Sequence, residues 1–211
     1  MIKKNLAFIL IINVFIICMA FKPDINESHL LNPTEWKLEK TGNDIKVYTR
    51  QSEGSSIKEF KAVTIVTANM KSLESLIENV SDYPNWQTNI ATAKILKQVN
   101  KTEQYIYYTT DLPWPMTDRD IVIFSGKTVD VDGTVRYNLL SKPDYITGTD
   151  DFLRIKNAKG MWQLTPQGNK IEIIYQFYGD PAGSIPSSII NMFIVDGPYS
   201  TLLNMKKKVG K

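Results

Sequence analysis

The chain has 211 residues, of which 25 are basic and 22 acidic, and its formal net charge of +3 gives no reason to expect nucleic acid as a partner. It contains one histidine and one cysteine, which excludes metal sites built from several Cys or His side chains. With 43% hydrophobic residues, a chain of this length is able to bury a substantial core.

Residues 1–20 are typical of a secretory signal peptide. Two lysines precede an apolar run over residues 6–21, and the small Ala20 provides a cleavage position. The run has 16 residues, fewer than the about 20 that a bilayer-spanning helix needs. We therefore predict cleavage after Ala20 and export to the periplasm or the exterior. A retained membrane anchor over residues 6–21 is the alternative.

The remainder of the chain divides into a polar spacer at residues 21–33 and one domain at residues 34–211. Alternating and β-branched residues predict strands at 36–38, 45–49, 57–68, 90–99, 103–110, 121–129, 134–140, 152–164 and 170–178. Turn residues separate these strands, and apolar residues at spacings of three and four predict a helix between Asn69 and Asn79.

A second predicted helix begins near Pro186, a residue that suits the first turn of a helix. Its first half is apolar nearly all round, as expected for a helix enclosed by a sheet. Gly197 and Pro198 interrupt it, because a proline removes one backbone donor and crowds the preceding turn. We expect a kink or a break at this point.

The segment 111–125, DLPWPMTDRDIVIFS, joins two predicted antiparallel strands. Alternation along each strand puts one set of side chains on a common face, namely Ile106, Tyr108, Thr110, Arg119, Ile121, Ile123 and Ser125. Asp120 lies on the opposite face. Since Arg119 stands between two aspartates, we expect these charges to hold the strand mouth together through hydrogen bonds rather than to catalyse a reaction.

Three motifs in this chain, DYPNWQ at 82–87, DLPWPMTDRDIV at 111–122 and GDPAGSIPSSIIN at 179–191, resemble the START family of steroidogenic acute regulatory protein-related lipid-transfer domains. The resemblance covers nearly all of residues 36–208. It implies an α+β helix-grip fold, in which a curved antiparallel sheet wraps around a long C-terminal helix and encloses an apolar tunnel for one lipid.

The resemblance and the strand alternation together give a set of predicted ligand-binding residues, which consists of Trp86, Ile106, Tyr108, Thr110, Arg119, Ile121, Ile123, Ser125, Trp162, Phe177, Met192 and Phe193. Known head-group sites do not transfer to this chain. The positions that match the aromatic choline cage of the phosphatidylcholine-binding branch are Tyr108, Ile121 and Ala158, of which one is aromatic. The positions that match the charged pair of the sterol-binding branch are Ile106 and Ser125.

We therefore expect a monomeric, non-enzymatic carrier or sensor of one lipid or other hydrophobic molecule, without cofactor or metal. The C-terminal helix and a neighbouring loop would act as its gate, with transient membrane contact. One alternative is a polyketide cyclase-like enzyme, in which Arg119 polarises a carbonyl and Asp120 or Tyr108 transfers a proton. Another is an interaction module with a vestigial cavity.

Overall fold

The computed structural model describes residues 35–52, 55–183, 185–186, 189–190 and 192–210. The predicted signal peptide, the spacer and the only histidine, His29, lie outside these residues, so the expectations attached to them stay predictions.

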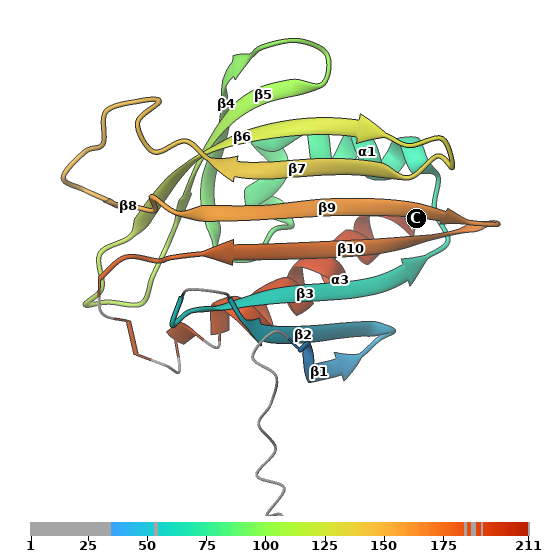
Figure 1. The fold of residues 1–211 in the computed structure, drawn as a ribbon, viewed down its shortest axis with the longest axis horizontal. Helices are drawn as coiled ribbons and strands as arrows, with labels where there is room; N and C mark the ends of the chain where they lie inside the picture. Colours follow the sequence, from blue (N-terminus) through green and yellow to red (C-terminus); the bar gives the residue numbers. More distant parts are fainter. Residues whose placement is uncertain (1–34, 53–54, 184, 187–188, 191, 211) are drawn as a thin grey trace, which may run out of the picture. The chain divides into compact units, whose positions relative to one another are not determined.

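A strongly curved antiparallel sheet forms most of the described part of the chain (Figure 1). Its strands are β1 (Lys37–Gly42), β2 (Ile45–Gln51), β3 (Lys58–Val66), β4 (Ile90–Gln98), β5 (Glu103–Thr110), β6 (Arg119–Val129), β7 (Val135–Ser141), β8 (Leu153–Arg154), β9 (Ala158–Gln167) and β10 (Lys170–Gly179). They lie in the order β1-β2-β3-β10-β9-β7-β6-β5-β4, and β8 adds a short parallel pair to β6. The first strands and the middle strands thus meet through β3 and β10.

Turn chemistry sets the hairpins that the sequence predicts. Asn43 and Asp44, between β1 and β2, have φ values of 51° and 57°, as a two-residue turn with the twist of a hairpin requires. Gly168, between β9 and β10, has a φ of 64°. Asparagine, aspartate and glycine tolerate this backbone region best, so these positions confirm the turn predictions.

The predicted strand at 152–164 is wrong as a single element. The structure divides it into β8 and β9, because β8 leaves the sheet order and pairs with the start of β6 instead. Leu153 N donates to Asp118 O and Ile155 N donates to Asp120 O, both at 2.9 Å. The chain between β7 and β9 therefore runs along the edge of β6 at residues 119–120, beyond the part of that edge that pairs with β7.

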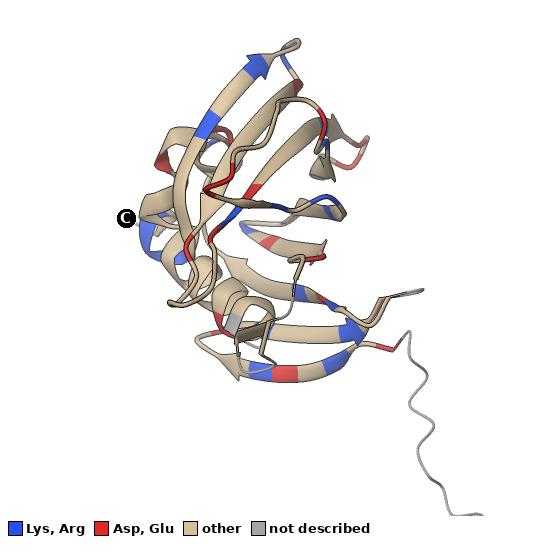
Figure 2. Cartoon of the chain, turned by 90° about the vertical axis from the view of Figure 1, so that its left-hand side faces the viewer, with Lys and Arg blue, Asp and Glu red and all other residues tan. Residues whose placement is uncertain are grey.

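Helices α1 (Met70–Glu78) and α3 (Gly197–Val209) lie on one side of the sheet (Figures 1 and 2). The sequence offers Asn69 and Ser72 as possible N-caps, and in the structure Asn69 caps α1, because its side chain accepts a hydrogen bond of 2.9 Å from Lys71 N. A π-helical turn, η2 (Met192–Asp196), precedes α3, and Pro198 lies in the first turn of α3. The expected break at Gly197 is thus a change of helix type.

The main core lies between the concave face of the sheet and the two helices. Leu202 and Met205 of α3 are fully buried with Ile45 and Val47 of β2, and Leu73 of α1 belongs to the same cluster. The described elements confirm the predicted α+β helix-grip fold.

Candidate functional site

A pocket of about 160 Å³ lies on the concave face of the sheet, near the first residue of β6. One wall comes from β5 and β6, another from β3 and β10, and the roof from η2 and the start of α3. Its aromatic lining consists of Phe60, Tyr108, Tyr175, Phe177 and Phe193. Isoleucine and leucine are the commonest of the other lining residues and most of the lining surface is apolar, so the pocket is suited to removing apolar atoms from water.

The register of β5 and β6 explains how one wall forms. Tyr108 lies opposite Ile121 and Thr110 lies opposite Arg119, so all four side chains share the concave face. All four also line the pocket. The predicted alternation along these strands is confirmed.

The opposite wall depends on small residues beside Phe177. A Cβ atom on Gly160, which pairs with Phe177 across the strands, would lie 2.5 Å from Phe177 Cδ2 and 2.5 Å from Gln176 O. A Cβ atom on Gly179 would lie 2.9 Å from Phe177 Cε1. The two glycines therefore make room for the aromatic ring of this wall. A glycine inside a predicted strand can thus indicate that a bulky group lies close to the backbone there.

Arg119 holds the pocket mouth through backbone carbonyls. Its Nε and Nη2 donate to Pro181 O and Ala182 O, each at 2.9 Å, and its Nη1 donates to Thr117 O. Burial lowers the pKa of Arg119, although Asp118 acts in the opposite direction. The guanidinium ties the segment before β6 to the segment after β10.

Trp86, Ile106, Ile123 and Trp162 do not line the pocket. They belong to the surrounding core and are at most 2% exposed. Trp162 stacks on Tyr175 with ring centroids 3.9 Å apart, and Trp86 packs on Trp162 at 5.8 Å. The structure therefore brings Tyr108, Thr110, Arg119, Ile121, Phe177 and Phe193 of the predicted site together around the pocket. The side chain of Met192 lies outside the described part of the structure.

The START domain model matches residues 26–207, which is most of the chain. The chain belongs to the START domain family. An uncharacterized protein of Pseudomonas aeruginosa is 36% identical over 178 residues, covering 84% of this chain and 88% of that protein. The phosphatidylcholine transfer protein of Rattus norvegicus is 24% identical over 183 residues, covering 84% of this chain and 85% of that protein.

Solved structures show the same START fold. A STAR-related lipid transfer protein from Xanthomonas axonopodis has a TM-score of 0.77 and 31% identity, over 83% of this chain and 99% of that chain. Human StAR-related lipid transfer protein 5 has a TM-score of 0.75 and 18% identity, over 86% of this chain and 89% of that chain.

The charges beside Arg119 in this START domain have separate partners. Asp120, which is 2% exposed, forms a two-pronged ion pair with Arg154, with Nε–Oδ1 and Nη2–Oδ2 distances of 2.8 and 2.7 Å. Tyr107 donates to the same carboxylate at 3.2 Å. Asp118 accepts a hydrogen bond from Leu112 N at 2.8 Å. The predicted hydrogen bonds at the strand mouth are confirmed, although each partner lies outside the triplet. The sequence did not predict the pairing of Asp120 with Arg154, because the two residues lie 34 positions apart.

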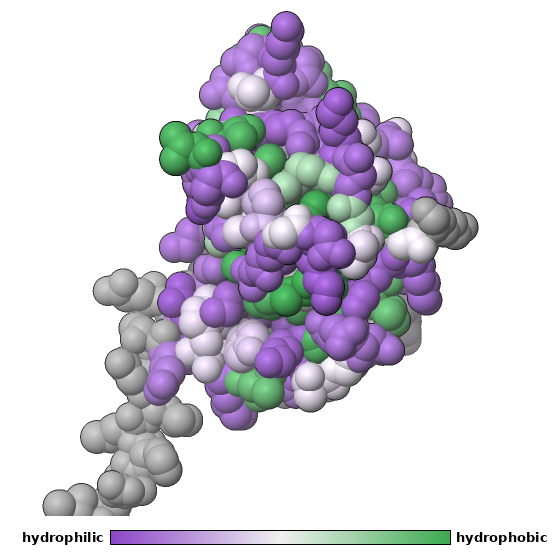
Figure 3. Space-filling model, turned by 90° about the vertical axis from the view of Figure 1, so that its right-hand side faces the viewer, coloured by the Kyte–Doolittle hydropathy of each residue, from purple (hydrophilic) through white to green (hydrophobic). Residues whose placement is uncertain are grey.

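A second hollow, of about 510 Å³, lies at the other end of β5 and β6. Ser125 lines it, together with Glu78, Gln98, Gln104, Lys127 and Tyr137. Figure 3 views the end of the sheet that carries the β6–β7 and β9–β10 turns, where hydrophilic residues cover most of the surface. The hollow is polar, unlike the pocket, and Ile106 and Ile123 lie between the two along the strands.

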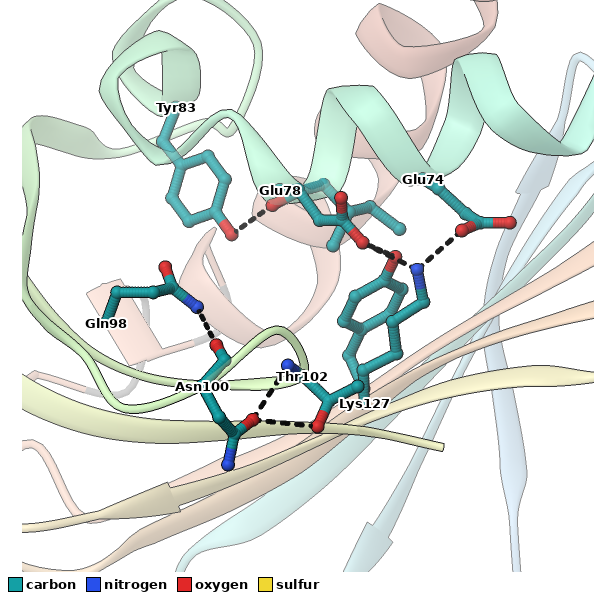
Figure 4. Close-up of polar contacts among 9 residues, drawn as sticks. Glu74, Glu78, Tyr83, Gln98, Asn100, Thr102 and Lys127 are labelled. Atoms are coloured by element: carbon teal, nitrogen blue, oxygen red, sulfur yellow. Dashed lines mark hydrogen bonds and ion pairs between the residues drawn. The ribbon is translucent and has the colours of Figure 1, made fainter. Parts of the chain in front are cut away.

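Lys127 lines the polar hollow and is the centre of a network of ion pairs and hydrogen bonds (Figure 4). Its Nζ lies 2.5 Å from Glu74 Oε2 and 2.7 Å from Glu78 Oε1, and Tyr137 donates to Glu78 Oε1 at 2.8 Å. Burial lowers the pKa of Lys127, but the hydrogen bonds to the two glutamates outweigh burial and the net effect raises it. These groups satisfy one another and link α1 to β6 and β7.

We also looked for metal sites and membrane-spanning helices. Among the described residues, no group of three or more His, Cys, Asp or Glu side chains lies close enough together to hold a metal ion. None of the helices that the structure describes combines the length and the apolar character needed to cross a membrane.

Proposed function

We propose that this START domain binds a hydrophobic ligand in the pocket and carries it without changing it chemically. The observation on which the proposal rests is the pocket itself, with five aromatic side chains and a mostly apolar lining surface between the sheet and the C-terminal helical segment. Burying a ligand methylene there gains about 0.8 kcal/mol. The names of the relatives, lipid transfer proteins and a phosphatidylcholine transfer protein, support a lipid as the ligand.

Ligand entry requires the roof to move. At about 160 Å³ the pocket is smaller than the roughly 300–1,000 Å³ of typical small-molecule sites. The junction between η2 and α3 at Gly197 is the natural hinge, because the hydrogen-bonding pattern changes there from π to α. Phe193 and Ile194, on the η2 side of this hinge, would swing with the roof.

The segment before β6 is the proposed membrane contact. Trp114 is 92% exposed in this segment, and Leu112 two residues earlier lines the pocket. Tryptophan side chains favour the interface between lipid and water, so Trp114 would hold the pocket mouth against a bilayer. The sequence of residues 1–20 supports a site of action outside the cytoplasm. We also propose that the domain works as a monomer.

The geometry gives less support to an enzyme. A cyclase-like mechanism needs Arg119 and an acid or base beside the ligand, but three donors of Arg119 already serve backbone carbonyls. Asp120 is paired with Arg154 on the convex face, and burial raises the pKa of Tyr108, which makes its phenol a weak acid that holds its proton at neutral pH. An interaction module with a vestigial cavity is also less well supported. Side chains would fill a vestigial cavity, whereas this pocket retains about 160 Å³.

A pocket-filling variant tests the proposal. Ile194→Trp places a larger side chain in the roof, and Ile174→Trp makes the same change on the convex face of β10. We expect native mass spectrometry of the purified protein to reveal a bound apolar molecule, and Ile194→Trp alone to reduce its occupancy and the uptake of a hydrophobic fluorescent dye. A wild-type protein that binds neither lipid nor dye would contradict the proposal.

A further inference from the structure

Two tyrosine side chains on different walls of the pocket have hydroxyl groups without a hydrogen-bond partner among the described residues. Tyr108 comes from β5 and Tyr175 from β10, and both line the pocket. Within the described ranges, neither hydroxyl is hydrogen-bonded, although Tyr83, Tyr107, Tyr137 and Tyr178 each donate to an acceptor. These two are therefore available to a ligand.

Gln87 adds a third neutral polar group to the lining. It follows the η1 turn (Val80–Asn85), is 7% exposed, and its side-chain amide has no partner among the residues that the structure describes. Tyr108 and Tyr175 are half-buried, and the one fully buried side-chain nitrogen or oxygen without a hydrogen bond among the described residues is Trp86 Nε1, so these three groups stay open to the pocket. Three uncharged hydrogen-bonding groups that open onto one small apolar space indicate where a ligand would form hydrogen bonds.

The phenols remain hydrogen-bond donors throughout the physiological range. Burial, together with the neighbouring phenols of Tyr175 and Tyr83, raises the pKa of Tyr108 well above the usual value. Burial likewise raises the pKa of Tyr175. Each hydroxyl therefore keeps its proton and presents it to an oxygen acceptor.

The charged residues of the lining argue against a charged ligand end. No aspartate or glutamate occurs among the described lining residues, so an ammonium group would find no counter-ion. Arg119 is the buried cation, and its guanidinium already serves three carbonyls. The other cation, Lys58, is exposed, so a buried carboxylate would lack a dedicated partner.

We propose that the pocket selects an uncharged ligand whose buried end carries a hydrogen-bond-accepting oxygen, such as a ketone or ester carbonyl, held by the hydroxyls of Tyr108 and Tyr175. This inference rests on the proposed function and adds the chemical class of the ligand. The aromatic walls take the apolar remainder, and Gln87 provides a neutral amide for a second oxygen.

Four probes of equal chain length test the selection, namely an alkyl methyl ketone, the alkane, the fatty acid and the alkyltrimethylammonium ion. We expect the wild-type protein to bind the ketone most tightly at neutral pH. Tyr108→Phe and Tyr175→Phe should each weaken ketone binding by about two- to tenfold, the effect of one hydrogen bond, and leave alkane binding unchanged. The ratio of the two affinities is insensitive to small changes in folding.

Tyr178→Phe is the matched control. It removes a phenol hydroxyl from the same strand, β10, but on the other face, where that hydroxyl donates to Ser55 Oγ at 3.0 Å. Its ketone-to-alkane ratio should equal that of the wild type. An unchanged ratio in both pocket variants, or a preference for the fatty acid or the ammonium ion, would overturn the inference while the carrier function stands. Binding of none of the four probes would instead contradict the carrier function.

Discussion

The two ends of the concave face of β5 and β6 have the same strand alternation but different chemistry. At the polar end, Lys127 pairs with Glu74 and Glu78, and Tyr137 donates to Glu78. At the pocket end, Tyr108 has no partner among the described residues and the neighbouring lining is apolar. Polar groups at the first end stabilise the protein through one another, whereas we propose that those at the second end bind a ligand. Satisfaction of hydrogen bonds, more than the size of the hollow, thus distinguishes a structural network from a binding site.

Alkaline pH should unfold the protein from both ends together. Burial raises the pKa of Tyr108 at the pocket end, and burial with the Glu78 hydrogen bond raises that of Tyr137 at the polar end. The folded state therefore holds these protons more tightly than the unfolded state, in which a phenol has a pKa of about 10. Stability is fully present below about pH 10 and falls as the pH rises further.

Circular dichroism and phenolate absorbance, recorded during the same titration, check this prediction. We expect the absorbance of the buried phenols to appear together with the loss of secondary structure. If all tyrosines ionise near their ordinary pKa while the dichroism stays native, the burial argument fails.

The apolar wall between the two ends should be sensitive to truncation. Ile123 is 1% exposed and lies opposite Ile106, which is 2% exposed. Ile123→Ala should lower the free energy of unfolding by about 2–5 kcal/mol, because it removes buried methyl groups and leaves a cavity. It should also lengthen the longest alkyl chain that the pocket accepts. Urea unfolding and a series of alkyl methyl ketones measure the two effects.

The control for this wall is Ile65→Ala, at a position of β3 that is 41% exposed. Its free energy of unfolding should change by less than about 1 kcal/mol, since surface substitutions have small effects. Equal losses in the two variants would contradict the burial argument for Ile123, and an unchanged limit on alkyl chain length would mean that Ile123 does not separate the hollows.

The polar end should affect stability without affecting ligand binding. Lys127→Met removes the cation between Glu74 and Glu78, whose carboxylates then repel each other. The side chains are 18%, 23% and 46% exposed, so solvent screening limits the loss to about 1–2 kcal/mol. Thermal unfolding measures the loss, and Glu74→Gln in the same chain should restore part of it. A large change in ketone affinity would show that the two ends are coupled.

Local patterns were sufficient to predict most of the fold. Alternation gave the strands, Asn43 and Gly168 gave turns, and Asn69 gave a helix cap, since each depends on residues close in sequence. Alternation also placed Tyr108 and Ile121 on one face. It did not separate pocket from core, because Ile106 and Ile123 share that face and differ only in what packs against them.

Long-range partners account for what sequence could not predict. Tyr175 belongs to the pocket because β10, which lies between β9 and β3 in the curved sheet, forms the wall opposite β5. Arg154 pairs with Asp120 only after the chain has left the sheet order and returned as β8. Gly160 of β9 leaves room for the ring of Phe177 on the neighbouring strand β10, and a glycine inside a predicted strand is a local signal of such a close approach.

The smallest expected effect concerns the roof at the pocket end. Lys40 of β1 lies 2.5 Å from Asp196 of η2, and its Nζ also lies 4.4 Å from the ring centroid of Tyr199. The two charged side chains are 37% and 57% exposed, so Lys40→Ala should cost no more than about 1 kcal/mol of stability. Because this pair joins the roof to the sheet beside the proposed hinge, the same change should speed the release of a bound dye. Stopped-flow displacement measures that rate. The control is Lys37→Ala, at a position that is 64% exposed and that pairs with Glu39 of the same strand. Equal release rates in the two variants would mean that this contact does not restrain the roof.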